Sequence, residues 1–462
     1  MSRLWLAAVL LAMSAAAPLA AAEAQWKVGL ARVKITPEQP VWMAGYASRD
    51  RPFASVHDDL YAKALVLADG GGTRAVLVTT DLIGLSAQVA DPIRRRIEAA
   101  TGIPATSVIL SSSHTHTGPS LSLDPTPREG RQLADTERTV AYTKSLQDKL
   151  VQVVAEAAKD LKPARLAWNT GVVHFVMNRR EYTTARGIIL GANPRGQADR
   201  SVPVLRIDGA DGKPLAVVFG AASHNTTLGP RDYEISGDYA GHAQRLVEEQ
   251  LPGVQAMFVL GCAGDANPYP RGSHEIAERH GKELGTEVLR VAQDTEKLAP
   301  VRGPLRVAWG QATLPLESAP SREELEKQAA GRSGTTPWIA QQMLERLDRG
   351  EKLPAEYASP LAVWQLGEDL TLVALSGEVV VDYVRLLEDA LGQGRLWIAA
   401  YCHDVYGYLP SARVLEQGGY ETRGLYAGGI GLFSPEAEGA LVREVAGLAA
   451  KAGRATANSG GK

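Results

Sequence analysis

Short apolar segments of strand length alternate with amphipathic helical segments along most of this chain, and this alternation constrains the fold more than any other feature. Strand-like runs occur at 64–67, 74–79, 108–110, 204–207, 215–219, 254–260, 370–375 and 396–400. Helical patterns occupy 91–100, roughly 137–161 and 274–294. A tight turn at 209–212 is typical of an antiparallel hairpin. The pattern predicts an α/β (α+β) fold with a layered, mixed β-sheet core flanked by helices.

The two ends of the chain differ from this pattern. Residues 1–22 combine Arg3, a short apolar run and small residues before Glu23, which predicts a signal peptide and a secreted or periplasmic protein. The run is too short for a membrane anchor. We expect one domain over 23–454, in which a capping box at Ser321 opens a helical insertion or flap over 318–358. The small, polar residues 455–462 predict a disordered tail.

Charge and cysteine content exclude several classes of partner. The formal net charge is −3, and no basic block indicates nucleic-acid binding or capture by a membrane surface. After residue 22 no apolar run is long enough to span a bilayer. Cys262 and Cys402 are too few for a disulfide scaffold, although a single bridge between them stays open. Composition does not indicate an oligomeric state.

The densest group of chemically capable residues is His114-Thr115-His116, shortly after the strand at 108–110. In extended backbone, residues i and i+2 point to the same face, so both imidazoles can address one site. Loops after strands often carry ligands and catalytic groups. The alternative is a pair of surface histidines in a loop rich in serine and threonine.

Four further features each follow a predicted strand. They are His224, the turn Gly264–Pro268, the pair Gly377-Glu378, and a tyrosine-rich segment from Tyr401 to Tyr420. Taken singly, each has an ordinary explanation: a structural histidine, a tight loop, a helix start or an aromatic patch. Taken together, they predict a site assembled from loops at one edge of a layered α/β domain.

The order of these motifs resembles the neutral/alkaline non-lysosomal ceramidase family. The matching segments are HTHTGP at 114–119, a histidine after a strand, GD-x-x-P at 264–268, GE at 377–378, and two tyrosines separated by eleven residues at 408 and 420. Met43–Tyr46, Leu60–Ala64 and Asn178-Arg179 add to the resemblance. It extends from about Val28 to Leu432, and it implies a short form that holds the family's N-terminal catalytic domain without the β-sandwich of the longer enzymes.

The resemblance also implies a site and a reaction. It implies one zinc ion per chain, with metal ligands His114, His224, Glu378 and Tyr408. It implies that the catalytic or substrate-positioning residues are His116, Arg179, Tyr420 and Asn267. The reaction would be hydrolysis of the N-acyl amide of a ceramide-like lipid by a zinc-activated water. Two departures from the family pattern concern this site, because Asn267 and Arg180 each stand where the family has serine.

Alternative functions remain open at this point. The main one is a zinc amidase for another N-acylated substrate, such as an amino sugar, a peptide or a different lipid. We expect an apolar groove to favour ceramide and a polar pocket to favour this alternative. A metallophosphoesterase would need the D-x-H and G-H-x-H motifs, which the chain lacks, and a serine hydrolase would need a G-x-S-x-G elbow. The last alternative is a secreted binding protein without activity.

Overall fold

The computed structural model describes residues 26–127, 130–331, 335–423 and 430–454. The predicted signal peptide at 1–22 and the predicted tail at 455–462 lie outside the described residues. Among the helices of these four described ranges, none combines the length and the apolar character that crossing a bilayer requires.

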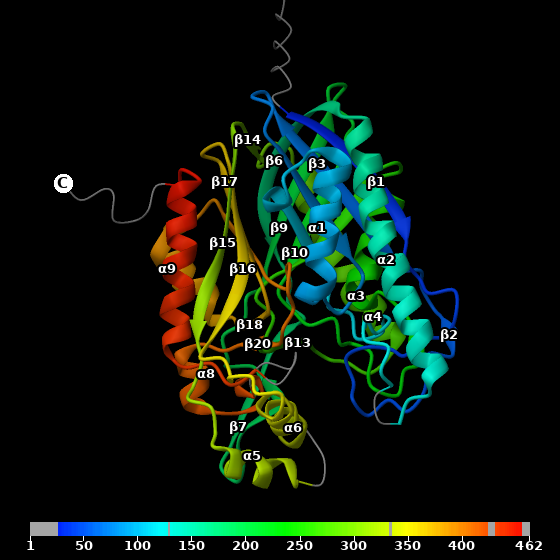
Figure 1. Ribbon diagram of the computed structural model, residues 1–462. Helices are drawn as coiled ribbons and strands as arrows, with labels where there is room; N and C mark the ends of the chain where they lie inside the picture. Colours follow the sequence, from blue (N-terminus) through cyan, green and yellow to red (C-terminus); the bar gives the residue numbers. More distant parts are fainter. Residues whose placement is uncertain (1–25, 128–129, 332–334, 424–429, 455–462) are drawn as a thin grey trace, which may run out of the picture.

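A large mixed sheet forms the centre of the molecule (Figure 1). Its nine strands follow the order β12-β10-β9-β6-β1-β3-β4-β5, with β14 paired to β6. The β10–β12 and β4–β5 pairs are parallel, and the other pairs are antiparallel. The strands are β1 (Trp26–Lys34), β3 (Tyr61–Asp69), β4 (Arg74–Thr80), β5 (Val108–Ser112), β6 (Lys162–Val172), β9 (Ser201–Gly209), β10 (Pro214–Ala221), β12 (Gln255–Leu260) and β14 (Ala299–Val301).

A second sheet packs against one face of the first. Its order is β15-β16-β17-β19, with β17 and β19 parallel. Its strands are β15 (Leu305–Pro315), β16 (Glu356–Leu366), β17 (Leu370–Leu375) and β19 (Leu396–Ala399). Leu65 and Leu67 of the first sheet share an apolar cluster with Trp364 and Trp397 of the second. The two sheets therefore bury one common layer of side chains.

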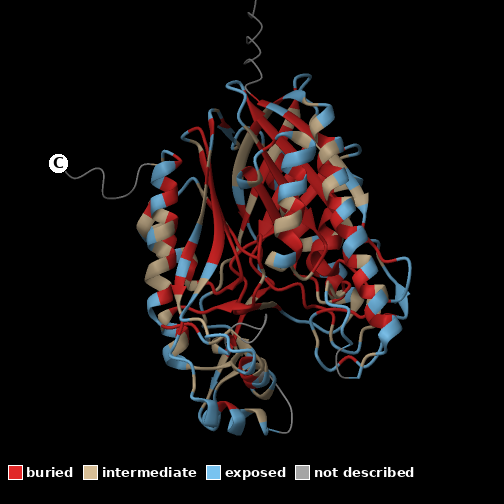
Figure 2. Ribbon diagram, in the orientation of Figure 1, coloured by how far each residue is buried: buried red, intermediate tan, exposed pale blue. Residues whose placement is uncertain are grey.

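Helices cover the two outer faces. Ala64 and Val66 alternate with Leu65 and Leu67, so they point away from the second sheet and pack under α1 and α2. The helices over the large sheet are α1 (Ala87–Thr101), α2 (Leu133–Lys159), α3 (Asp238–Gln250) and α4 (His274–Gln293). On the second sheet, α9 (Glu436–Lys451) packs along β15 and β16 beside α7 (Asp382–Leu391). The result is a helix–sheet–sheet–helix arrangement whose strands are buried (Figure 2), and the predicted fold class is confirmed.

Several short elements gather near one end of the sheets (Figure 1). They are β2 (Ser55–Val56) paired with β11 (Glu234–Ile235), β18 (Glu378–Val379) paired with β20 (Tyr408–Leu409), and the sheet of β13 (Ala266–Pro268), β7 (Val176–Thr183) and β8 (Gly187–Asn193). The remaining helices of the described residues are α5 (Arg322–Ala329), α6 (Thr335–Asp348), α8 (Ala412–Gln417) and the 3₁₀ turns Ala105–Ser107 and Tyr420–Thr422.

The predicted helical insertion contains two helices rather than one continuous stretch. The capping box is present: Ser321 and Glu324 exchange their side-chain and backbone hydrogen bonds at the start of α5. Leu325 of α5 packs with Ala340 and Met343 of α6 in a small separate apolar cluster. The predicted helix at 91–100 begins earlier, at Ala87, with Pro92 inside α1.

Candidate metal centre

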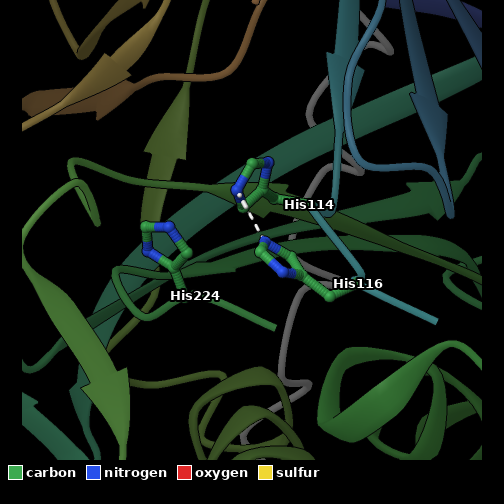
Figure 3. Close-up of side chains that lie close together, drawn as sticks. All are labelled: His114, His116 and His224. Carbon is green, nitrogen blue, oxygen red and sulfur yellow. Dashed lines mark hydrogen bonds between the residues drawn. The ribbon is translucent and has the colours of Figure 1, made fainter. Parts of the chain in front are cut away.

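Two histidine segments are brought side by side by a single parallel bridge. The chain leaves β5 at Ser112, and His114 adopts a left-handed backbone conformation with φ of 63°. Thr115 then forms a parallel bridge with Asn225, and the amide of His116 donates to the carbonyl of Asn225 over 3.2 Å. His224 therefore lies next to His114 and His116 (Figure 3). A non-glycine residue at positive φ is costly and is often found at functional sites.

A second parallel pairing supplies two oxygen donors. In the β18–β20 pair, Glu378 lies directly opposite Tyr408. Gly377, just before Glu378, has φ of 81°, and a Cβ atom there would come within 2.8 Å of the Tyr406 ring. Only glycine fits this turn without displacing the tyrosine. This steric requirement explains why a glycine precedes Glu378.

The four residues expected to bind metal converge on one point. The Nε2 atom of His114 lies 3.2 Å from Glu378 Oε2, and the Nε2 atom of His224 lies 3.1 Å from the same oxygen. Tyr408 Oη lies 3.4 Å from His224 Nε2. Ligand atoms bound to a tetrahedral zinc at about 2.0–2.2 Å are separated by roughly 3.3 Å. The spacing and the donor set of two nitrogens and two oxygens therefore fit zinc.

Backbone carbonyls orient both histidine ligands. His114 Nδ1 lies 2.5 Å from the carbonyl oxygen of Ile83, and His224 Nδ1 lies 2.7 Å from that of Ala263. If each Nδ1 carries the proton and donates it, each Nε2 lone pair faces the cluster, which is the usual arrangement around a metal-binding histidine. Burial and Arg179 lower the pKa of His224 to about 3, so the ring is in the neutral form that metal binding requires.

His116 differs from the two other histidines. Its Nε2 atom lies 3.1 Å from His114 Nε2 (Figure 3), so the three rings also form a group that could hold an ion. However, His116 Nδ1 is buried and has no hydrogen-bond partner among the described residues. Because it lacks an orienting carbonyl, we favour Glu378 over His116 as the third ligand. Burial, His114 and His224 lower the pKa of His116 well below its ordinary value, which leaves its imidazole neutral.

Arg179 borders the centre on the side of Tyr408. Its guanidinium carbon lies 5.3 Å from the centre of the Tyr408 ring and 5.7 Å from that of Tyr420. Its NH1 atom donates to the side-chain oxygen of Asn267 over 3.4 Å, and Thr226 donates to that oxygen over 3.2 Å. The guanidinium also donates a hydrogen bond to the Tyr408 phenol. Arg179 thus contacts one of the predicted metal ligands directly.

The structure brings all eight predicted site residues into one contiguous group. Two important neighbours were missed by the sequence reasoning. Glu421 is 1% exposed and accepts from Arg179 Nε over 2.9 Å and from Arg180 NH1 over 2.6 Å. Arg180, noted above only as a departure from the family pattern, therefore forms a buried ion pair with Glu421. Glu421 lies 242 positions after Arg179 and 241 after Arg180, so no local signal could have revealed these contacts.

Asp265 is the second missed neighbour. Its Oδ1 atom accepts from the amide of Val381 over 2.8 Å, and its Oδ2 atom accepts from the side-chain amide of Asn178 over 3.1 Å. Its own carbonyl accepts from the amide of Arg179 over 2.8 Å. Asp265 therefore ties the Arg179 strand to the segment after Glu378. The Gly-Asp motif was the available signal, but by itself it indicated only a turn.

The two cysteines are free thiols. Cys262 and Cys402 are both buried, and neither forms a disulfide. Burial raises the pKa of Cys402 to about 12, which makes it an unreactive thiol at neutral pH. The bridge left open by the sequence is absent from this structure.

Comparison with known sequences gives a consistent result. The family model for the N-terminal part of neutral/alkaline non-lysosomal ceramidases matches residues 26–287. Neutral ceramidase B of Dictyostelium discoideum is 27% identical over 250 residues, which are 50% of this chain and 33% of that protein. The neutral ceramidase of Pseudomonas aeruginosa is 27% identical over 274 residues, which are 57% of this chain and 40% of that protein. The matches thus span well under half of these relatives' length.

Comparison with solved structures extends over nearly the whole chain. The crystal structure of neutral ceramidase from Pseudomonas aeruginosa superposes with a TM-score of 0.71 at 21% identity, covering 93% of this chain and 74% of that one. A ceramidase complexed with C2 gives a TM-score of 0.70 at 20% identity. At this identity the likeness establishes the fold. The family model stops at residue 287, before Glu378, Tyr408 and Tyr420. The structural match covers 93% of the chain and therefore extends past that point.

Proposed function

Because this chain belongs to the neutral/alkaline non-lysosomal ceramidase family, we propose that it is a zinc-dependent amide hydrolase that cleaves the N-acyl bond of ceramide-like lipids to a fatty acid and a sphingoid base. The observation that carries the proposal is the convergence of His114, His224, Glu378 and Tyr408 beside His116. The proposed location is secreted or periplasmic, on the basis of the N-terminal sequence.

The four converging residues would hold one zinc ion. When bound, zinc supplies a Lewis acid that polarises an amide carbonyl and lowers the pKa of water toward about 7. Burial raises the pKa of the Tyr408 phenol well above its ordinary value, so without a cation this group stays neutral. Glu378 supplies the formal negative charge next to the ion, while the neutral imidazoles supply directed lone pairs.

His116 is the proposed proton carrier. Its ring is neutral and lies against His114 through Nε2. A neutral imidazole at this position can accept a proton from the attacking water and later donate one to the departing amine. General acid–base assistance of this kind typically contributes about 10²–10⁴-fold to rate.

Arg179 and Tyr420 are the proposed donors to the oxyanion that forms as the carbonyl is attacked. The guanidinium of Arg179 lies against the Tyr408 and Tyr420 rings, which supports this role, since one such donor is worth about 2.7–4 kcal/mol in an active site. Asn267 accepts from Arg179 through its amide oxygen and therefore holds the guanidinium in place. An amide is not a nucleophile, so a covalent route through residue 267 is disfavoured in this chain.

The second candidate is the alternative left open by the sequence, an amidase for a polar N-acyl compound. A cavity of about 670 Å³ is lined by Asn178 and Arg180, the chain neighbours of Arg179, and by none of the eight predicted site residues. Its lining combines Arg195 and Arg413 with Tyr182 and Ile188, so both polar and apolar groups face it. The choice between the two candidates therefore rests on a comparison of substrates.

Fatty-acid release from purified protein tests both candidates. The substrates are short- and long-chain ceramides, an N-acyl amino acid and an N-acyl amino sugar, each with and without a chelator and with zinc restored. Chelator-sensitive ceramide cleavage supports the proposal. Cleavage of only the polar amides supports the second candidate, and no cleavage by zinc-loaded protein rejects both.

A further inference from the structure

Three polar side chains that the proposed reaction does not use meet at the surface. His57 directly follows β2, Glu234 begins β11, and His274 is the first residue of α4. The parallel β2–β11 pairing sets Glu234 opposite Ser55, two residues before His57. We call His57, Glu234 and His274 the surface triad. Three separate segments of the chain thus contribute one side chain each.

One carboxylate oxygen is the focus of the surface triad. His274 Nε2 lies 3.2 Å from Glu234 Oε2, and His57 Nδ1 lies 4.0 Å from the same atom. The two imidazole rings are stacked with centroids 3.9 Å apart. The other oxygen, Glu234 Oε1, accepts from the Ser55 hydroxyl over 2.8 Å, which fixes the orientation of the carboxylate. One potential ligand atom from each of the three side chains lies within 4.8 Å of the other two.

Neighbouring residues could form a competing group, but they are already engaged. His57, Asp58 and His242 also offer atoms within 4.8 Å of one another. However, Arg245 binds Asp58 over 2.9 Å and donates to His242 Nδ1 over 2.7 Å. The second oxygen of Asp58 accepts from Ser236 over 2.7 Å. With Nδ1 of His242 accepting, its Nε2 carries the hydrogen and has no lone pair for a metal.

We propose that the surface triad is a second metal site, distinct from the catalytic centre, that binds a first-row divalent transition ion such as Zn²⁺. Two imidazole nitrogens and one carboxylate oxygen suit zinc, nickel, cobalt or copper, and not magnesium or calcium. The side chains of His57, Glu234 and His274 are 38%, 44% and 23% exposed, so an ion reaches them from solvent. Three protein ligands leave positions for water, which predicts weaker, exchangeable binding.

An ion at this site would cross-link three segments of the chain. It would link the chain after β2, the start of β11 and the first turn of α4, which otherwise meet through one short strand pair and single side-chain contacts. An ion that binds only the folded form stabilises a protein by RT ln(1 + [ion]/Kd), which grows with ion concentration. A rise in the thermal unfolding midpoint is therefore a readout that needs no enzymatic activity.

The test is equilibrium dialysis against buffered zinc at micromolar free concentration, with bound metal counted per folded chain. We expect two ions in the natural chain. His57→Ala, His274→Ala and Glu234→Gln should each weaken the second ion at least about tenfold and remove the part of the zinc-dependent rise in unfolding midpoint that the second ion causes. Glu234→Gln keeps an oxygen for Ser55, so it preserves the local fold. His174→Ala, which removes an exposed histidine elsewhere, is the matched control and should bind two ions.

A fourth variant separates this inference from the proposed function. His114→Ala should lose the catalytic-centre ion and keep the surface ion. One ion in the natural chain that disappears in His114→Ala would overturn the surface site while leaving the catalytic proposal intact. Equal loss in His174→Ala and His274→Ala would also overturn it, since binding would then be diffuse.

Discussion

The proposed catalytic centre, called the catalytic centre below, and the surface triad both use histidine and glutamate side chains but surround them differently. In the catalytic centre, His114 and His224 are 2% and 0% exposed, and each has its second ring nitrogen on a backbone carbonyl. In the surface triad, His57 is exposed and His274 is half-buried, and their rings stack on each other beside Glu234. Burial and fixed orientation distinguish a permanent, reactive ion from an exchangeable one.

This comparison also separates two ways of ordering a site. The catalytic centre is held by bridges between loops, Thr115 with Asn225 and Glu378 with Tyr408, and by buried charges at Glu421 and Asp265. All of these contacts are made between protein groups. The surface triad would gain much of its order from the ion itself. Mutations should therefore have large effects at the first site and small effects at the second.

The largest effect is expected from His114→Ala. Removing one nitrogen ligand should abolish tight zinc binding and lower kcat/KM for amide cleavage by about 1000-fold or more, since several kcal/mol of transition-state stabilisation is lost. Bound zinc and fatty-acid release are measured on the same preparation, with His174→Ala as the control. Retention of activity in His114→Ala would show that the converging residues are not the catalytic centre.

Glu421→Gln should have the next largest effect. It removes the anion that both Arg179 and Arg180 contact, and stranding a buried charge typically costs about 3–5 kcal/mol of unfolding free energy. Zinc content should be unchanged while kcat falls, because Arg179 loses its anchor. The control is Asp348→Asn, which breaks an exposed pair with Arg322 and should cost under about 1 kcal/mol. Equal effects in urea unfolding would contradict the distinction between buried and exposed pairs.

A pH dependence of stability is expected from Asp265. Burial raises its pKa to about 6, above the ordinary value near 3.9, so the folded protein binds this proton more tightly than the unfolded chain. The resulting stability is full below about pH 4 and is lost as the pH rises through 6, a change of about 3 kcal/mol. Urea unfolding of metal-free protein at pH 4 and 7 measures it. Asp265→Asn should lack this component, whereas Asp211→Asn on an exposed turn should keep it.

Much of the architecture was predictable from sequence because its signals are local. The strand runs at 74–79 and 370–375 and the helix at 274–294 are visible as periodic apolar patterns, and all are present. The separation into two stacked sheets was not predictable, because it depends on strands β15 and β16 pairing across the inserted helices. The order of strands in a sheet is a long-range property that periodicity does not encode.

The candidate site likewise has one part that the sequence predicts and one part that it does not. His114, His116, His224, Glu378 and Tyr408 stand out as polar residues after strands or by their likeness to a family, and they do meet. The groups that orient these residues could not be predicted from the sequence. The carbonyls that contact His114 and His224 belong to Ile83 and Ala263, and every residue has a backbone carbonyl. The surface triad was missed for a related reason, because its three members come from separate segments and none has a motif.

Gly45→Ala should reduce activity through a steric effect. A Cβ atom at Gly45 would lie 2.4 Å from the His116 ring, and the residue has φ of 93°. Displacing His116 by about 1 Å should cost roughly 100-fold in kcat with zinc retained, since proton transfer depends on geometry. Gly72→Ala is the matched control, because Gly72 has φ of 90° with nothing within 4 Å. If both variants lose activity equally, backbone strain and not the His116 contact is responsible.

The smallest effect on activity is expected when only the surface ion is removed. A weak chelator should first remove the ion from the surface triad, since the ligands there are less buried and lack carbonyl partners. Fatty-acid release should then change by less than about twofold. A stronger chelator should then remove the catalytic ion and abolish release. Metal content and activity are followed through the same titration. Ser236 connects the segments that carry the two sites, because it donates to Asp58, next to His57 in the chain, while its carbonyl accepts from Thr115 and Thr117. A fall of tenfold or more with the first ion would mean that this connection couples the two sites, and the surface triad would then regulate the catalytic loop.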